Sequence, residues 1–267
     1  MAPQPPSRSI GDLTSPEVTR FLKETSILCL PLGAIEQHGR HLPLNTDLIV
    51  AEGLTRRIVA QAGEAFDLWR LPALSLGLSR EHDWAPGTLS LSVQNFAAVL
   101  REYAREIVRS LPARNLVIVN CHGGNRGIVE NLLHEMRSDF ALNACAIHPF
   151  DLAKVDTGEA CDVHGGKSET SIMLALAPDL VRREMLRRPE NPPDPKSIRE
   201  LIFDRGVTWP WRTDDPRIAR EGIIGDAADA SAELGEAIID SVVQEAGAVF
   251  QRLLENRKLM PGGGGAR

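Results

Sequence analysis

The chain has 267 residues, of which 43% are hydrophobic and 25% are charged, and its formal net charge is −6. This composition is that of an ordinary soluble globular protein. No basic run could neutralise several phosphates and no apolar run is long enough to span a bilayer, so we expect neither nucleic acid nor membrane as a partner.

Between the two ends of the chain, apolar runs alternate with stretches of helical periodicity. Extended segments are predicted at residues 26–32, 68–76, 115–120 and 142–148. Helices are predicted at residues 47–62, 92–111, 126–140, 169–176 and 229–254, and the Pro-rich residues 187–195 are predicted to be a loop or lid. The alternation predicts an α/β fold, a three-layer α/β/α sandwich with a mostly parallel central sheet.

The two ends of the chain suggest the limits of the folded domain, and the cysteines suggest the cellular compartment. The Pro- and Ser-rich residues 1–9 and the Gly-rich residues 259–267 are predicted to be disordered, which leaves residues 10–258 as a single domain. The four cysteines form no CxxC pair, which favours a reducing compartment over a disulfide framework. The first residues contain no apolar signal region, so we predict a cytoplasmic protein.

Polar side chains that can bind metals follow two of the predicted strands. Glu36 and His38 follow the first strand, and His122 follows the strand at 115–120. Because ligand sites of parallel sheets lie at the carboxyl ends of the strands, these side chains are placed where a site is expected. Each has an ordinary alternative when taken alone, since His122 could merely cap the turn that Gly123 and Gly124 form.

Two further carboxylates stand at the starts of predicted helices. Asp47 opens the helix at 47–62 and Glu169 lies in the first turn of the helix at 169–176, positions where a carboxylate often only caps a helix or interacts with its dipole. Together with Glu36, however, they make three carboxylates beside the imidazoles of His38 and His122. Such a set is sufficient to hold two divalent cations, with one carboxylate bridging.

The segments PLGAIEQHGRHLPLNTD, EHDWAPGTLSL, NCHGGN, HGGKSETS and GIIGDAADASAELGE together resemble the creatininase (creatinine amidohydrolase) family. The resemblance covers residues 25 to 245. It implies the three-layer α/β/α fold, a homohexamer, and two divalent metal ions per chain (zinc, manganese or iron). It also implies hydrolysis of C–N bonds.

The resemblance assigns roles residue by residue. It implies that Glu36 and His122 hold one metal, that His38 and Glu169 hold the other, and that Asp47 bridges them. The resemblance also implies that His164 is the catalytic residue. Apart from the resemblance, the position of Gly123 and Gly124 after His122 leaves room for a ligand, and we predict that Glu81, His82, Gly123 and Gly124 bind the substrate. The segment that contains Glu81 and His82 is predicted to line the substrate entrance, although a structural turn accounts for it equally well.

Two positions depart from the creatinine-hydrolysing members of the family. Those members have an acidic metal ligand where this chain has Gly124, and an acidic residue before the catalytic histidine where this chain has Val163. Both differences argue against creatinine as the substrate.

The resulting hypothesis is a metal-dependent hydrolase that cleaves an amide or cyclic amide of a small molecule through a metal-bridging water. Three alternatives within the family remain open: hydrolysis of a formamide on a pyrimidine nucleotide, as in deazaflavin biosynthesis, trimming of a small modified peptide, as in mycofactocin maturation, and ring opening of a keto-inositol by C–C cleavage. A non-catalytic metal or metabolite binder on the same fold is the alternative from another class.

Overall fold

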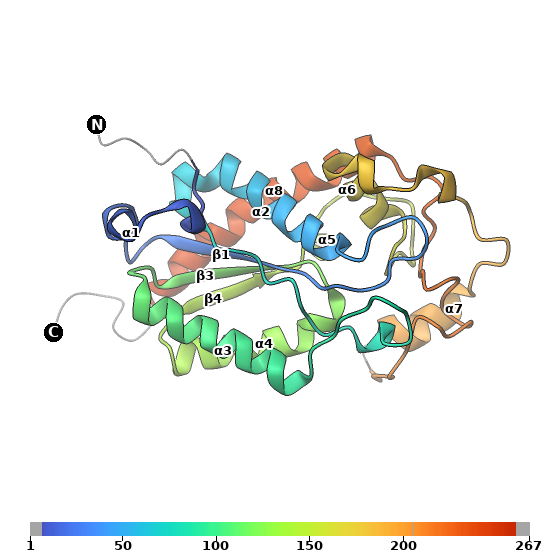
Figure 1. Cartoon of the computed structure of the whole chain (residues 1–267), viewed down its shortest axis with the longest axis horizontal. Coiled ribbons are helices and arrows are strands. Elements are labelled where there is room, and N and C mark those ends of the chain that lie inside the picture. Colours follow the sequence, from blue (N-terminus) through green and yellow to red (C-terminus); the bar gives the residue numbers. More distant parts are fainter. Residues whose placement is uncertain (1–6, 205, 260–267) are drawn as a thin grey trace.

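The computed structural model describes residues 7–204 and 206–259, and its centre is a parallel sheet with the strand order β2–β1–β3–β4 (Figure 1). The strands are β1 (Ile27–Leu32), β2 (Leu68–Arg70), β3 (Asn115–Asn120) and β4 (Asn143–Ile147). Every residue of β1 and β3 is buried, as expected of apolar strands that are covered on both faces. The mostly parallel sheet of the sequence-based prediction is confirmed.

One face of the sheet is covered by α2 (Thr46–Phe66), α6 (Lys167–Leu176) and α8 (Ala232–Arg257), which lie above the strands in Figure 1. Their apolar stripes interlock with the strands because the apolar positions recur at helical spacing. Fully buried members of this half of the core are Val50, Leu54, Ile58, Ile172, Ile239, Val242 and Phe250.

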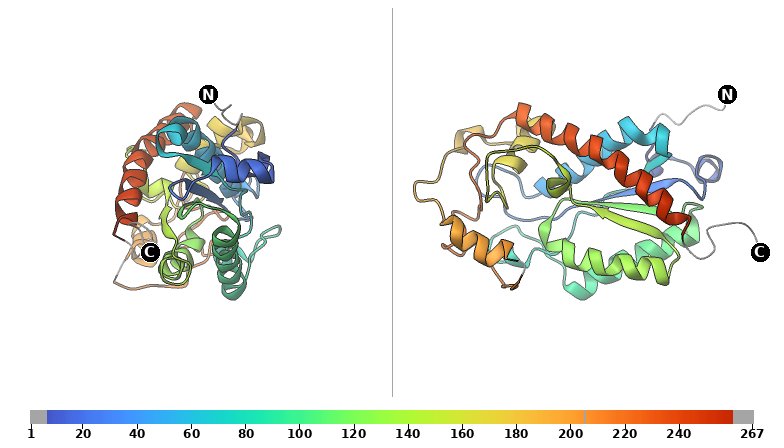
Figure 2. Two further views of the ribbon diagram at one scale, coloured as in Figure 1. Left: turned by 90° about the vertical axis from the view of Figure 1, so that its left-hand side faces the viewer. Right: turned by 180° about the vertical axis from the view of Figure 1, so that it is seen from behind.

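The opposite face is covered by α3 (Val93–Ser110) and α4 (Arg126–Ser138), so the molecule has three layers, as the end-on view of Figure 2 shows. The Ser92 hydroxyl caps the start of α3 by accepting a hydrogen bond from the Asn95 N–H. The core on this side contains Trp69, Phe96, Leu100, Leu116, Ile118, Val129 and Leu132. The α/β/α sandwich predicted from the sequence is confirmed.

Shorter elements complete the chain. They are α1 (Ser15–Phe21), α5 (Pro149–Leu152), α7 (Pro195–Ile198), a π-helical turn (Arg199–Phe203) and the 3₁₀ turns η1 (Ile10–Asp12), η2 (Arg80–His82), η3 (Gly123–Asn125), η4 (Pro178–Leu180) and η5 (Arg183–Met185). No helix among the described residues is both long and apolar enough to cross a membrane.

The predicted disordered ends fall mostly outside the description, since residues 1–6 and 260–267 are not among the described residues. Arg8 and Ser9, however, belong to the fold. The Arg8 carbonyl accepts a hydrogen bond from the Arg70 N–H, and the Arg8 guanidinium is 3.1 Å from the Asp67 carboxylate. The folded part of the chain therefore includes residues that we expected to be disordered.

The register of the sheet determines where the polar loops meet. Leu32, the last residue of β1, pairs with Asn120, the last residue of β3. The loops that follow these residues therefore leave the same edge of the sheet side by side, and they carry Glu36, His38 and His122.

Candidate metal centre

The loop after β1 is held tightly against the start of α2. A Cβ atom at Gly33 would lie 2.6 Å from the backbone nitrogen of Leu48, so only glycine permits this approach. The approach places Asp47, in the first turn of α2, beside the Glu36 side chain. A glycine at the end of β1 thus helps to bring two carboxylates from different elements together.

Glu36 lies at the centre of the site and is completely buried. Its Oε2 is 3.2 Å from Nδ1 of His122, and its Oε1 is 3.3 Å from Nε2 of His82 and 3.5 Å from Nδ1 of His164. Imidazole nitrogens from three separate loops therefore face one carboxylate.

Asp47 connects the two halves of the site. Its Oδ1 is 3.3 Å from Nε2 of His38, and its Oδ2 is 3.4 Å from Nδ1 of His122. Glu169, in the first turn of α6, places its Oε2 3.8 Å from the same His38 nitrogen. Each oxygen of Asp47 thus faces a different imidazole, the arrangement that a bridging carboxylate requires.

These side chains form two groups with ligand atoms close enough to share an ion, and the groups have Asp47 in common. One group is Glu36, Asp47 and His122, and the other is His38, Asp47 and Glu169. They are the two sets that the family resemblance implied. Ligand atoms of Glu36, His38 and His164 also lie close enough for a third grouping, which makes His164 a potential ligand as well as a potential catalytic residue.

Buried polar atoms without partners support the fit to cations. Among the described residues, both carboxylate oxygens of Glu36, Nε2 of His38 and Oδ2 of Asp47 are buried and make no hydrogen bond. Such atoms are costly to bury unless a charged group satisfies them. All four point into the cluster, and a carboxylate–imidazole donor set is suited to zinc or manganese.

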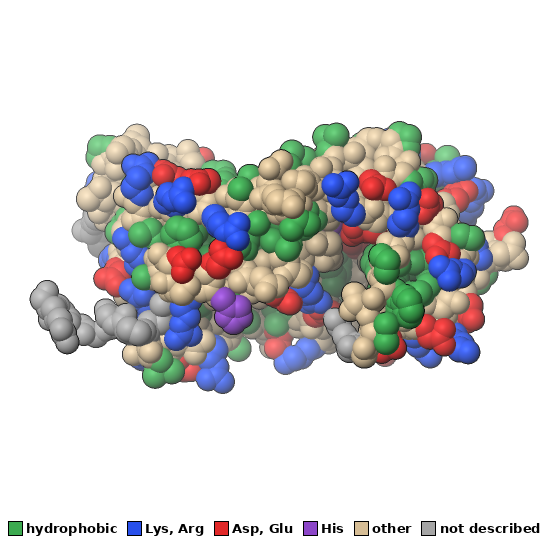
Figure 3. Space-filling model, turned by 90° about the horizontal axis from the view of Figure 1, so that it is seen from below, with side chains coloured by type: hydrophobic (Ala, Val, Ile, Leu, Met, Phe, Trp, Pro, Cys, Tyr) green, Lys and Arg blue, Asp and Glu red, His purple; other side chains and the backbone are tan. Residues whose placement is uncertain are grey.

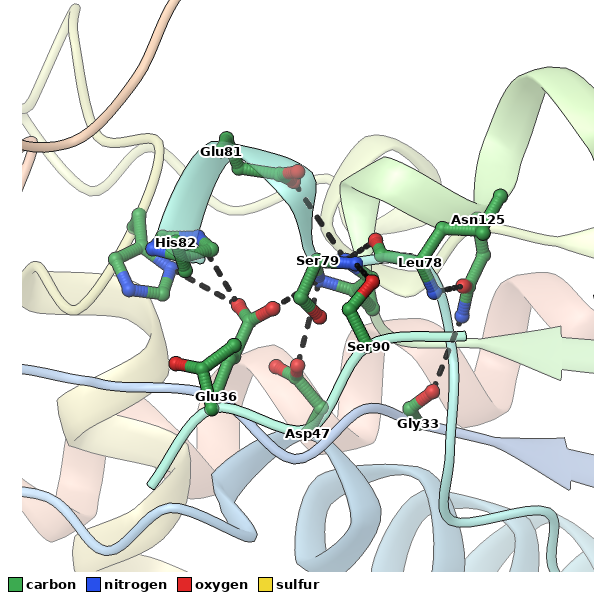
Figure 4. A network of polar contacts seen from close by, with 12 residues as sticks. Gly33, Glu36, Asp47, Leu78, Ser79, Glu81, His82, Ser90 and Asn125 are labelled. Carbon is green, nitrogen blue, oxygen red and sulfur yellow. Dashed lines mark hydrogen bonds and ion pairs between the residues drawn. The ribbon is translucent and has the colours of Figure 1, made fainter. Parts of the chain in front are cut away.

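The non-coordinating sides of the imidazoles are hydrogen-bonded in the way that metal ligands require. Nδ1 of His38 donates to the backbone carbonyl of Glu36 at 3.1 Å, and Nε2 of His122 donates to the carbonyl of Leu78 at 2.5 Å. These bonds leave Nε2 of His38 and Nδ1 of His122 as the free lone pairs. Asn125 fixes Leu78 by accepting from its N–H and donating to the Gly33 carbonyl (Figure 4).

The carboxylates and imidazoles of the cluster shift one another's pKa values. Burial and the neighbouring Glu36 raise the pKa of Asp47, and burial raises the pKa of Glu169 to about 8 although His38 opposes the shift. Burial lowers and Asp47 raises the pKa of His38, with a net rise to about 9. Burial raises and His122 lowers the pKa of Glu36, with a net fall well below its usual range. Asp47 and Glu169 are thus the carboxylates that resist ionisation, and divalent cations would stabilise their charged forms.

His164 lies beside this cluster in the neutral form. Its Nε2 donates to the Gln37 backbone carbonyl at 2.7 Å, so the lone pair of Nδ1 faces Glu36. Burial, together with the nearby His82 and His38, holds the pKa of His164 well below its usual range. The lone pair of Nδ1 is therefore free and directed into the cluster, while the lowered pKa keeps the ring uncharged.

The four residues predicted to bind substrate surround the same cluster in different ways. His82 is buried against Glu36, and burial lowers the pKa of His82 to about 4. Oε1 of Glu81 is 3.6 Å from Nε2 of His122. A Cβ atom at Gly123 would meet nothing within 4 Å, whereas one at Gly124 would lie 2.5 Å from the His122 ring. Room for a ligand beside the backbone is thus found at Gly123.

Sequence reasoning missed two residues that orient the imidazoles. The Gln37 amide nitrogen donates to the Gly222 carbonyl at 2.9 Å and lies 2.9 Å from Nδ1 of His82. The Thr213 hydroxyl lies 2.8 Å from that same Nδ1. Gln37 stands between the predicted ligands Glu36 and His38, and this position could have identified it. Thr213 lies outside every motif that pointed to the site.

The fold and the cluster together define an α/β protein with a buried carboxylate–imidazole site at the ligand-binding edge of its sheet. The sequence model described as "Creatininase: Creatinine amidohydrolase" matches residues 11–250. The chain therefore belongs to the creatininase family of hydrolases.

Two curated relatives of different activity have the same sequence identity to this chain. The mycofactocin precursor peptide peptidase of Mycobacterium tuberculosis (strain CDC 1551 / Oshkosh) is 31% identical over 246 residues, covering 88% of this chain and 89% of that protein. The creatinine amidohydrolase of Pseudomonas putida is 31% identical over 257 residues, covering 88% of this chain and 93% of that protein.

Solved structures of creatininases share the fold. A creatininase variant of the Zn–Zn type superposes with a TM-score of 0.74 at 29% identity, over 92% of this chain and 98% of that one. A manganese creatininase superposes with a TM-score of 0.71 at 27% identity, over 92% of this chain and 98% of that one. Creatininases that resemble this chain thus carry zinc or manganese.

Proposed function

We propose that the protein is a metal-dependent hydrolase that cleaves an amide or cyclic amide C–N bond with two divalent ions held by Glu36, His38, Asp47, His122 and Glu169. The observation that carries the proposal is the pair of ligand groups sharing Asp47, with buried, unpartnered atoms directed into both. Bound zinc or manganese would lower the pKa of a water shared by the ions and polarise the carbonyl of the substrate.

The residues around the ions then provide proton transfer and orientation. His164 is neutral at the outset because burial depresses its pKa, and its free Nδ1 would take the proton released by the attacking water and pass it to the leaving nitrogen. Gln37 holds His164 through its backbone carbonyl and touches His82 through its side chain, which keeps both rings directed at Glu36. His82, Glu81 and Gly123 are the groups that we propose contact the substrate.

The choice of substrate turns on two positions. At Gly124 the chain has no carboxylate, and the space that a side chain would occupy there is filled by the His122 ring and Glu81. Val163 packs on an apolar cluster that contains Ile224 and provides no charge beside His164. Glu81 brings a carboxylate to the space beside Gly124, so the preference rests on Val163, which offers a cationic, guanidine-like ring no charge. We therefore expect a neutral or anionic amide to be preferred.

Cleavage of a small modified peptide is the second candidate function. The similarity to the mycofactocin precursor peptide peptidase supports it, at the same identity as the creatinine amidohydrolase. A panel that includes creatinine, simple amides, short peptides and keto-inositols separates these candidates. A protein that binds metal and hydrolyses none of these compounds would be the non-catalytic binder.

The central test is metal analysis of an Asp47→Ala variant. Because each oxygen of Asp47 faces a different imidazole, its loss should remove both ions, and activity with them. Asp179→Ala, at an exposed carboxylate in η4, is the matched control and should retain two ions per chain. Circular dichroism shows whether the variant is folded. A folded Asp47→Ala protein with its full complement of metal would contradict the bridging assignment.

We also propose that the protein is a homohexamer, on the strength of the family resemblance. Light scattering at micromolar concentration tests this, and a monomer would contradict it.

A further inference from the structure

A pocket lies close to the candidate metal centre but outside it. Its volume is about 440 Å³. Its charged lining comes from three separate parts of the chain: Arg40, Arg187, Arg188, Glu190, Arg220 and Glu221. Elsewhere on the surface, for example on the face shown in Figure 3, basic and acidic side chains are interspersed. The pocket lining contains four guanidinium groups and two carboxylates.

Arg220 is held in a fixed orientation by the backbone. Its Nε donates to the Asn191 carbonyl at 2.5 Å, and its Nη1 donates to the carbonyls of Pro216 and Ala219. No carboxylate pairs with it among the described residues, and its Nη2 makes none of these bonds. The fold thus immobilises a half-buried cation and leaves two N–H donors and the positive charge unused.

The other three guanidinium groups differ in how far they are neutralised. Arg188 is 2.7 Å from Asp226 and 2.6 Å from Asp229, so its charge is compensated. Arg40 is 3.2 Å from Glu221, which also lines the pocket.

Arg187 is exposed and makes no hydrogen bond or ion pair in the part of the chain that the structure describes. Two guanidinium groups, those of Arg187 and Arg220, are therefore available to one occupant. Forked N–H donors of this kind match the oxygens of a phosphate or carboxylate group.

Two residues of the pocket wall, Ile223 and His41, also contact segments that carry residues of the candidate metal centre. Ile223 lines the pocket and packs on Gly39 and Gly165, where added Cβ atoms would lie 2.8 and 2.2 Å from its side chain. Gly39 and Gly165 each follow a histidine of the candidate centre directly. His41, on the pocket wall, contacts Thr170 at 2.9 Å, next to Glu169. A ligand in the pocket would therefore lie beside the reacting region.

We propose that this pocket binds the phosphate or carboxylate group of a small anionic ligand, with Arg187 and Arg220 as the recognising residues. The group could belong to a separate anion or to the far end of a substrate held at the metal centre, and only the second source rests on the proposed function. Both sources need the same oxyanion chemistry.

Calorimetric titration of the metal-loaded protein with inorganic phosphate tests the proposal. Replacing Arg187 with Gln removes one charge-assisted contact and should weaken phosphate binding roughly tenfold or more. Raised ionic strength should also weaken phosphate binding to the wild-type protein, because salt screens the charge of the exposed Arg187. Arg183→Gln, an exposed arginine four residues earlier that does not line the pocket, is the matched control and should bind phosphate normally.

The outcomes separate the pocket from the metal centre. Phosphate that coordinates a metal would bind equally well to Arg187→Gln, so unchanged binding in this variant overturns the proposal, as does the absence of phosphate binding in the wild type. The Arg220→Gln variant, if circular dichroism shows that it is folded, should also bind phosphate more weakly than the wild type. The panel of amide substrates then shows whether the bound anionic group belongs to a substrate or to a separate molecule. A selective loss of kcat/KM for anionic amides in Arg187→Gln indicates that the group is part of the substrate. Unchanged kcat/KM together with lost phosphate binding indicates a separate anion. If no amide is hydrolysed, the phosphate result still stands.

Discussion

Adjacent glycines in η3 provide a sharp test of how the candidate metal centre is packed. In Gly124→Ala, the new Cβ would lie 2.1 Å from the Leu78 carbonyl oxygen and 2.5 Å from Nε2 of His122, well short of the 3.4 Å at which ordinary contact begins. These are the two atoms whose hydrogen bond orients His122. The methyl group must therefore separate them and turn the ring away from Glu36.

The expected cost follows from these contacts. Overpacking of a well-filled site costs about 1–3 kcal/mol, and an orphaned buried donor or acceptor costs about 1–3 kcal/mol more. A loss of about 3 kcal/mol corresponds to a fall in Tm of roughly 6–12 °C for a domain of this size. The metal held by Glu36, Asp47 and His122 should also be lost, because the His122 lone pair is misdirected.

Gly123→Ala is the matched control. A Cβ there would meet nothing within 4 Å, and Gly123 is not among the glycines with positive φ. Alanine should therefore be neutral or stabilise the fold by about 0.4–1 kcal/mol. Thermal unfolding and metal analysis of both variants decide the matter. Equal Tm and equal metal content in the two variants would refute the packing on which the orientation of His122 depends.

Three further predictions concern chemistry. His164→Ala should keep both ions while turnover falls by roughly 10²–10⁴-fold, and a loss of metal instead would identify His164 as a ligand. Creatinine should be a poor substrate because Val163 offers it no charge, and steady-state turnover of about 1–10³ per second with saturating zinc or manganese would contradict this. Iodoacetamide should modify Cys161 before Cys145 in the native protein, as followed by mass spectrometry, since burial raises the pKa of the Cys145 thiol to about 12.

The layers of the fold could be predicted because buried strands and amphipathic helices leave different periodicities in the sequence. The run NLVIVN became β3 with the predicted limits, and the predicted helix at 92–111 became α3. The short helix α7 and the π-helical turn after it were not predicted, because the Pro-rich sequence before them carries no helical periodicity.

The candidate site was predictable to the extent that parallel strands align their ends. Glu36 and His122 each follow a strand, so the topology alone brings them together. Gln37 and Thr213 were not foreseen because they act through hydrogen bonds to the rings, and such bonds have no fixed spacing in sequence. The arginine-lined pocket could not be predicted from the sequence either, because Arg40 and Arg220 are far apart in the chain.

The wide spread of the proposed ligands along the chain couples metal supply to folding. The set runs from Glu36 to Glu169, so an unfolded chain cannot hold these carboxylates and imidazoles around one ion. By mass action, an ion that binds only the native state adds about 2.7 kcal/mol to the free energy of unfolding at roughly 100 times its Kd. The protein should therefore unfold more readily in a chelator, and starvation for the metal would reduce its abundance in the cell as well as its activity.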